Sequence, residues 1–308
     1  MALIPPSRLA AIPHLGTFLA GHERAVVGWG RKPSGRRAQR LAGWLGRPVA
    51  LLEDGLLRSV GRGDPPLSLL VDDIGVYYDA AAPSRMEHSI AAGASPRQAA
   101  RALALAAAWR AGGLSKYNHA PDPAALPTGP YVLLADQCRG DLSIAGAQAC
   151  AASFARMAEA AAVEFPHHAL VLKTHPDAHS HGRASCLPPA LGAHPRAVPV
   201  ADGCHPARLI AGAAAVYTVS SQIGFEALIW GRPLRCFGLP FYAGWGLAEE
   251  DRPPPARRAA GARLEDLLHA ALVVLARYVD PASGRAWQAE EAFAHVASAR
   301  RQRARPAG

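Results

Sequence analysis

The sequence predicts an α/β protein made of two Rossmann-like halves, with parallel sheets facing a cleft between them. Apolar, β-branched runs alternate along the chain with Ala-rich helical stretches, a pattern typical of a parallel sheet with crossover helices. Of the 308 residues, 50% are hydrophobic, enough for two modest cores. Two of the apolar runs end in polar residues, as strands that hold a ligand at their carboxyl ends do.

The first half contains short apolar runs around an Arg-rich helix near 36–46, followed by a long Ala-rich helix near 97–111. The apolar runs, in order, are Ala25–Trp29, Pro48–Leu52, Leu67–Val71 and Gly75–Tyr78.

Prolines and a glycine between Pro121 and Pro130 mark the best linker in the chain. We therefore predict an N-terminal Rossmann-like domain over 1–125, a second one over 126–260, and terminal helices over 261–308 that pack back on the first. The second half is expected to contain strands at Tyr131–Ala135, 169–173, 214–219 and Leu234–Phe237, helices at 146–163, 205–212 and 222–231, and terminal helices near 263–278 and 287–303.

Composition narrows the class of protein. No apolar run is long enough to span a bilayer and the N-terminus lacks a secretory pattern, so we expect a cytoplasmic protein. The five cysteines are scattered singly, which argues against a disulfide framework and a zinc site, and no metal is expected. The net charge is +9, and arginines crowd together over 300–305. That cluster is either a solvated tail or a contact with an anionic membrane.

Two strand ends predict one anion site. The run ending at Val219 is followed by Ser220, Ser221 and Gln222, which open a helix. The first N–H groups of a helix attract phosphate, because they have no internal partner and carry partial positive charge. The strand 169–173 likewise ends in a polar stretch, Lys173-Thr174-His175-Pro176. Two such ends in one sheet predict a shared crevice at its carboxyl edge.

Two adjacent carboxylates, Glu53 and Asp54, close the strand Pro48–Leu52 and are followed by Gly55. At the carboxyl edge of a sheet they suit general acid or base chemistry. Alternatively, one caps the following segment and the other pairs with Arg58.

The loop Asp136–Ser143 contains Asp141, which suits either a helix N-cap or a carboxylate that attacks a sugar carbon. The loop Gly238–Gly246 suits either stacking on a base or sugar, or a packed turn. Neither a P-loop nor a dinucleotide-binding glycine motif is present, which argues against those enzyme classes.

Taken together, the motifs resemble one module of the bacterial capsule polysaccharide biosynthesis proteins of the KpsC type, over about Ile12 to Pro281. The motifs that carry this resemblance are Glu-Asp-Gly-Leu-Leu-Arg-Ser (53–59), the Pro-Pro to Asp-Ala stretch (65–80), Ser-Lys-Tyr-Asn (115–118), the Asp-Gln loop with Asp-Leu-Ser, Lys-Thr-His-Pro-Asp (173–177), Ser-Ser-Gln-Ile-Gly-Phe-Glu-Ala-Leu (220–228) and Phe-Tyr-Ala-Gly-Trp-Gly-Leu (241–247).

The resemblance implies a GT-B-like fold and a retaining β-Kdo glycosyltransferase that uses CMP-Kdo. By the same resemblance, Asp141 is the nucleophile that forms a covalent Kdo adduct and Glu53 is the acid/base, while His175, Ser220 and Ser221 bind the CMP phosphate. The expected binding residues also include Pro176, Lys173, Gln222, Gln137, Ser143, Asp54, Gly55 and Arg58.

No cofactor is implied besides the donor CMP-Kdo. The implied acceptor is a lipid-linked Kdo glycan at the cytoplasmic face of the inner membrane, and the implied partners are a second Kdo-transferase module or capsule assembly proteins, without nucleic acid. Two alternatives stay open: an inverting CMP-sugar transferase with Glu53 or Asp54 as base, and a non-catalytic module that binds an anionic glycan or nucleic acid through arginines.

Overall fold

The chain divides into two compact α/β units in the computed structural model, which describes residues 2–5, 8–61, 63–175, 183–200, 203–258 and 260–304. Unit 1 comprises Met1–Tyr77, Ala82–His119 and Glu265–Gly308, and unit 2 comprises Tyr78–Ala81 and Ala120–Leu264. Besides the short excursion at Tyr78–Ala81, the chain passes between units at 119/120 and 264/265, whereas the sequence placed the boundaries at 125/126 and 260/261.

Unit 2 is built on a parallel sheet of strand order β6-β5-β4-β7-β8-β9. Two strands, β4 (Tyr131–Ala135) and β5 (Ala169–Lys173), have the predicted bounds. Continuous apolar runs mark them in the sequence because a strand covered on both faces has no solvent-exposed side. The other strands are β6 (Ala197–Pro199), β7 (Ala215–Thr218), β8 (Leu234–Cys236) and β9 (Glu249–Glu250).

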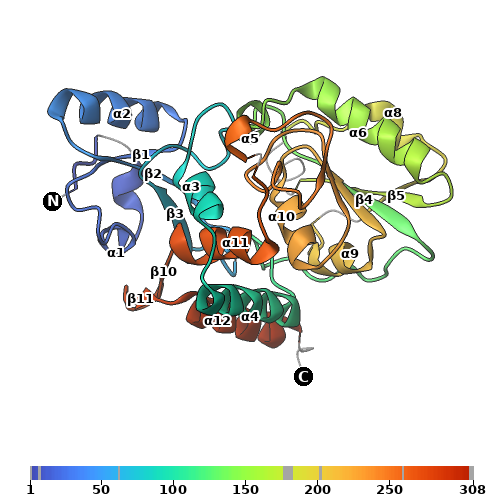
Figure 1. The fold of residues 1–308 in the computed structure, drawn as a ribbon. Helices are drawn as coiled ribbons and strands as arrows, with labels where there is room; N and C mark the ends of the chain where they lie inside the picture. Colours follow the sequence, from blue (N-terminus) through green and yellow to red (C-terminus); the bar gives the residue numbers. More distant parts are fainter. Residues whose placement is uncertain are drawn as a thin grey trace. The chain divides into compact units, whose positions relative to one another are not determined.

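Helices cover both faces of this sheet (Figure 1). On one face, Phe154 and Met157 of α6 and Leu191 of α8 pack with sheet residues such as Val132 and Leu134 in a single apolar cluster. The helices of unit 2 are α5 (Leu142–Gly146), α6 (Ala151–Glu164), α8 (Pro189–Gly192), α9 (Ala207–Gly212) and α10 (Gln222–Ile229), with the 3-10 turn η2 (Ala256–Arg258). The helix predicted over 146–163 is α6, which begins later, at Ala151, and the short helix α5 precedes it.

The sheet of unit 1 is mixed, and the prediction of a parallel sheet is wrong for this half. Its strand order is β1-β2-β3-β10-β11, and only the β1–β2 pair is parallel. The strands are β1 (Val26–Trp29), β2 (Val49–Asp54), β3 (Ser68–Asp72), β10 (Ala276–Val279) and β11 (Ala286–Trp287).

A further prediction about unit 1 is wrong. The helix expected over 263–278 ends earlier, because α11 (Leu264–His269) and a π-helical turn, η3 (Ala270–Val274), are followed by β10. The apolar run Gly75–Tyr78 lies in bends and turns after β3.

The remaining helices of unit 1 lie around its sheet and along its C-terminal segment. Trp109 of α4 and Phe293 of α12 meet edge to face with ring centroids 5.4 Å apart, so the C-terminal helix packs on α4. The helices are η1 (Arg8–Ala11), α1 (Leu15–Phe18), α2 (Pro33–Leu45), α3 (Arg85–Ala92), α4 (Pro96–Gly112) and α12 (Ala289–Ala304). Within the described part of the chain, no helix combines the length and the apolar character needed to cross a membrane.

Candidate active site

The carboxyl ends of three neighbouring strands of unit 2 lie at one level of the sheet. Ala135 at the end of β4 is in register with Lys173 of β5 on one side and with Thr218 of β7 on the other. The segments that follow these strands therefore leave the sheet side by side, at the edge where open α/β sheets bind ligands.

Gln137 links the segments after β4 and β7. Its Oε1 accepts hydrogen bonds from Ser220 N at 2.9 Å and Ser220 Oγ at 3.1 Å. Its Nε2 lies 3.0 Å from Ser220 Oγ and donates to Ser143 Oγ at 3.1 Å, and the two serine hydroxyl oxygens are 3.4 Å apart. Three residues predicted for the substrate site, distant in sequence, thus form one polar cluster.

Asp141 caps α5. Its Oδ1 accepts a hydrogen bond from Ser143 N at 2.9 Å, and its backbone is extended, as expected at an N-cap. The carboxylate is half-buried. The capping interaction engages one carboxylate oxygen and holds the group beside the Gln137–Ser143–Ser220 cluster, so capping and a chemical role are compatible.

Ser221 is the N-cap of α10. Its Oγ accepts a hydrogen bond from Ile223 N at 3.3 Å, and its own N–H donates to Thr218 Oγ1 at 3.0 Å. Gln222, in the first turn, donates to Glu226 Oε1 at 3.1 Å. The helix therefore begins directly after the strand end, with Ser220 and Ser221 half-buried at its N-terminus.

The Gly- and aromatic-rich loop after β8 is a packed turn, which decides between the two interpretations of its sequence. Phe241, Tyr242 and Trp245 are fully or almost fully buried, so their rings cannot stack on a ligand base. Tyr242 Oη donates to the carbonyl of Ser221. Buried Arg258 donates to the Pro240 carbonyl at 2.7 Å, which ties the loop to the segment after it. The hydrogen bond from Tyr242 thus joins this loop to the start of α10.

Asp136 stabilises the loops at this edge of the sheet, a role that the sequence analysis did not assign to it. It is only 2% exposed, and its Oδ1 accepts hydrogen bonds from the N–H groups of Gln137, Cys186 and Leu187 at 2.8, 3.0 and 3.1 Å. A buried carboxylate that takes several backbone donors fixes the loops that supply them. The sequence signal was its place directly after β4, one residue before Gln137.

Lys173 and His175 lie at the end of β5. The Lys173 ammonium is buried and donates to the Thr174 carbonyl at 3.0 Å, while His175 is half-buried. Pro176 lies outside the described residues. The register brings this strand end next to that of β4.

In unit 1, the predicted carboxylates lie at the end of β2. Glu53 and Asp54 are half-buried, and Asp54 forms an ion pair with Arg58 at 3.3 Å. Gly55 donates to the Ser68 carbonyl at 3.0 Å, and a Cβ at this position would lie 1.8 Å from Ser68 Oγ. The glycine is therefore required by the close approach of the neighbouring strand, and its predicted binding role stays a prediction.

Lys116 is a charged neighbour of these carboxylates that sequence reasoning left without a role. Burial lowers the pKa of Lys116, but the electrostatic influence of Tyr117 and Tyr77, and then of Asp54 and Glu53, outweighs it and raises the pKa above its usual range. Lys116 is consequently a cation at neutral pH. The signal in the sequence was the Ser-Lys-Tyr-Asn motif itself.

Asn118 of the same motif holds this segment against the one that follows β2. Asn118 is 1% exposed, and its Nδ2 donates to the carbonyls of Ser59 and Ser115 at 3.2 and 2.7 Å. Arg58 N also donates to the Lys116 carbonyl at 2.9 Å. The two motifs 53–59 and 115–118 are thereby joined into one structure.

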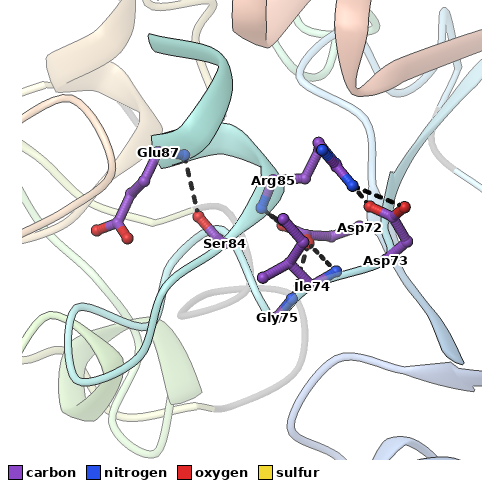
Figure 2. A network of polar contacts seen from close by, with 7 residues as sticks. All are labelled: Asp72, Asp73, Ile74, Gly75, Ser84, Arg85 and Glu87. Atoms are coloured by element: carbon purple, nitrogen blue, oxygen red, sulfur yellow. Dashed lines mark hydrogen bonds and ion pairs between the residues drawn. The ribbon is translucent and has the colours of Figure 1, made fainter. Parts of the chain in front are cut away.

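Asp72 and Asp73, in the 65–80 motif, shape a loop. Figure 2 shows Asp72 accepting from the backbone N–H groups of Ile74, Gly75 and Arg85, at 2.8 to 3.1 Å. Asp73 forms a two-pronged ion pair with the Arg85 guanidinium at 2.7 and 2.9 Å. That contact lowers the pKa of Asp73. Together the two aspartates fix the turn after β3 to the start of α3.

The sequence matches the family described as "Capsule polysaccharide biosynthesis protein" over residues 24–111 and 104–279. It is 38% identical to the capsule polysaccharide modification protein LipA of Neisseria meningitidis serogroup B, over 98% of this chain and 46% of LipA. It is 33% identical to the lipopolysaccharide-processing protein LpsZ of Rhizobium meliloti, over 89% of this chain and 64% of LpsZ. The chain therefore spans about half the length of LipA.

Two solved structures from Thermosulfurimonas dismutans have similar folds. The KpsC β-Kdo 2,4 transferase superimposes with a TM-score of 0.86 at 34% identity, covering 96% of this chain and 97% of that one. The KpsC β-Kdo 2,7 transferase superimposes with a TM-score of 0.67 at 26% identity, covering 93% and 89%. The fold is thus that of a GT-B-like glycosyltransferase, as the motif resemblance implied.

Proposed function

This chain belongs to the capsule polysaccharide biosynthesis family, and from that premise we propose that it is a Kdo glycosyltransferase. The observation that carries the proposal is the structural similarity to the β-Kdo 2,4 transferase over almost the whole of both chains. The donor in this proposal is CMP-Kdo, and the acceptor is a lipid-linked glycan that ends in Kdo.

The strand ends of unit 2 are the donor site in this proposal. The first turn of α10, with Ser220 and Ser221, supplies N–H and hydroxyl donors for the CMP phosphate, and His175 and Lys173 come from the neighbouring strand end. Gln137 holds Ser220 in place through both ends of its amide.

Chemistry proceeds by two displacements at the anomeric carbon of Kdo. A carboxylate oxygen of Asp141 bonds to that carbon as its bond to the phosphate oxygen breaks, and CMP leaves with the electron pair. The acceptor hydroxyl oxygen then bonds to the same carbon, displaces Asp141 and gives its proton to the Glu53 carboxylate. Two inversions retain the configuration.

The motifs of unit 1 serve the acceptor in this proposal. A Kdo-terminated acceptor carries a carboxylate, so cations that stay charged at neutral pH suit its recognition. Lys116 and Arg58 suit this role: Arg58 follows β2 and pairs with Asp54, and its N–H donates to the Lys116 carbonyl.

Product stereochemistry tests the proposal. The protein is incubated with freshly generated CMP-Kdo and a synthetic Kdo-terminated lipid, and the new linkage is analysed by NMR. A β-linked Kdo residue is expected. An inverted product would replace the covalent route by direct attack with Glu53 or Asp54 as base, and transfer from another CMP-sugar in preference to CMP-Kdo would refute the donor assignment.

A further inference from the structure

We infer that the outer face of α2 is a docking surface for an anionic lipid bilayer. The face consists of Lys32, Arg36, Arg37, Arg40, Trp44 and Leu45, all exposed. This inference concerns a surface of unit 1 and does not depend on the proposed transferase activity.

The first observation is how α2 is packed (Figure 1). Its buried residues are all small: Gly35, Ala38 and Ala42. A Cβ at Gly35 would lie 1.9 Å from the Gly30 carbonyl oxygen, so the helix backbone lies directly on the segment after β1. Leu41 is the one large side chain of α2 that packs partly against the apolar cluster of Val26, Ala38 and Ala42, whereas Arg36, Arg37, Arg40 and Trp44 are exposed.

The second observation is charge. Residues 31–47 contain six basic residues and no acidic one. Among the residues that the structure describes, Arg36, Arg37 and Arg40 form no ion pair. A basic helix face without ion pairs is attracted to anionic lipid head groups. Each Lys or Arg near the bilayer surface raises the affinity by about fivefold.

The third observation is the position of Trp44. Its side chain is 82% exposed, and the neighbouring Leu45 is 39% exposed, at the last turn of the helix. Arg36, Arg40 and Trp44 follow each other at intervals of four residues and therefore share one stripe. A tryptophan and an aliphatic residue beside a row of arginines is the composition of helices that lie in the membrane interface.

These observations favour a bilayer over other polyanions. Arginines alone would serve nucleic acid equally well, but an exposed Leu beside the Trp gains nothing from phosphate contacts or base stacking. The Trp44 and Leu45 side chains both gain free energy from insertion into the boundary between head groups and acyl chains. The basic segment at the C-terminus is a separate candidate, and the experiment separates the two.

Vesicle binding by the full chain tests the inference. Sedimentation is measured with phosphatidylcholine vesicles and with vesicles containing phosphatidylglycerol, for the wild type and for Arg36→Glu/Arg40→Glu. The matched control is Arg97→Glu/Arg208→Glu, which lowers the net charge equally at two other exposed arginines. Circular dichroism and thermal melting establish that each variant is folded.

We expect the wild type to bind only the anionic vesicles, the α2 variant to bind roughly tenfold or more weakly, and the control to keep most of its affinity. Brominated lipid is expected to quench fluorescence in the wild type, with the quenching reduced in Trp44→Ser.

Four outcomes would overturn the inference. The first is no binding of the wild type to anionic vesicles, and the second is an equal loss of binding in the α2 variant and its control. The third is binding that disappears only when residues 296–308 are removed. The fourth is an α2 variant that binds vesicles as the wild type does but loses DNA affinity or changes its oligomeric state.

Discussion

The side-chain amide of Gln137 contacts Ser220 through both its oxygen and its nitrogen. Oε1 accepts from the Ser220 N–H at 2.9 Å while Nε2 lies 3.0 Å from the Ser220 hydroxyl oxygen. This contact joins the loop after β4 to the segment between β7 and α10, and it fixes the residue that precedes the α10 N-cap. The donor site of our proposal depends on this connection.

Replacing Gln137 by Met removes the amide and keeps the length of the side chain. We expect the free energy of unfolding to fall by about 1–3 kcal/mol, because buried donors and acceptors lose their partners, and the affinity for CMP to fall by roughly tenfold. Calorimetric titration with CMP and denaturant unfolding measure the two effects. The exposed Gln39→Met is the matched control. Unchanged CMP affinity in a folded Gln137→Met protein would contradict the role given to Ser220.

Lys116→Met tests the cation beside the carboxylates of unit 1. We expect the transfer rate to fall by about tenfold or more at saturating donor, with KM for the acceptor raised, because an anionic acceptor loses a charge-assisted contact. Lys116→Arg is expected to restore part of the activity. Equal acceptor kinetics for wild type and Lys116→Met would remove Lys116 from acceptor recognition.

Asn118→Ala tests how much Asn118 contributes to the stability of the fold. Asn118 is buried and its amide donates to two carbonyls, so the variant is expected to lose about 1–3 kcal/mol of unfolding free energy. Thermal and denaturant unfolding check this. A loss below a few tenths of a kcal/mol would mean that the 53–59 and 115–118 motifs hold together without it.

The Asp73–Arg85 pair predicts a pH dependence of stability. Because the pKa of Asp73 is lower in the folded state than in the unfolded chain, its contribution is fully present above the unfolded pKa of about 3.9 and is lost as the pH falls through the folded value. The pair is partly exposed, so its contribution is about 1 kcal/mol or less. Unfolding of wild type and Asp73→Asn at pH 7 and below pH 4 measures it. The difference between the two proteins should shrink in acid, and a growing difference would contradict the assignment.

The cysteines should differ in reactivity. Cys150 is exposed, whereas burial and, second, the nearby Asp136 raise the pKa of the half-buried Cys186 thiol to about 11. A thiol reagent at pH 8 is therefore expected to label Cys150 rapidly and Cys186 slowly. Labelling of native Cys150→Ser, with the denatured protein as reference, checks this; rapid labelling of Cys186 would contradict its described environment.

The sequence predicted unit 2 better than unit 1 for a physical reason. Buried parallel strands such as β4 and β5 are continuous apolar runs with polar residues at their ends, and their pairing follows from the alternation of strands and helices. In unit 1, β3 pairs antiparallel with β10, which comes about two hundred residues later along the chain. No local pattern encodes such a partner. Ala276–Val279 also continues an apolar, helix-like run and was therefore assigned to a helix.

The same distinction applies to the candidate site. Ser220 and Ser221 could be singled out because they follow an apolar run and open a helix, and Gln137 because its motif resembles the family's. The register brings the ends of β4 and β7 together. Asp136 and Lys116 could not be given roles from the sequence alone. Their environments depend on backbone N–H groups and carboxylates contributed by other segments, which only the folded chain brings together.

The central claim is that Asp141 of this chain carries Kdo from CMP-Kdo to an acceptor. Intact-mass analysis of a synthetic Kdo-terminated lipid after incubation with CMP-Kdo tests it most directly, with wild type beside Asp141→Ala. The account predicts an acceptor one Kdo heavier with the wild type, and none with an Asp141→Ala protein that is folded and still binds CMP. Equal product from both proteins would contradict the claim.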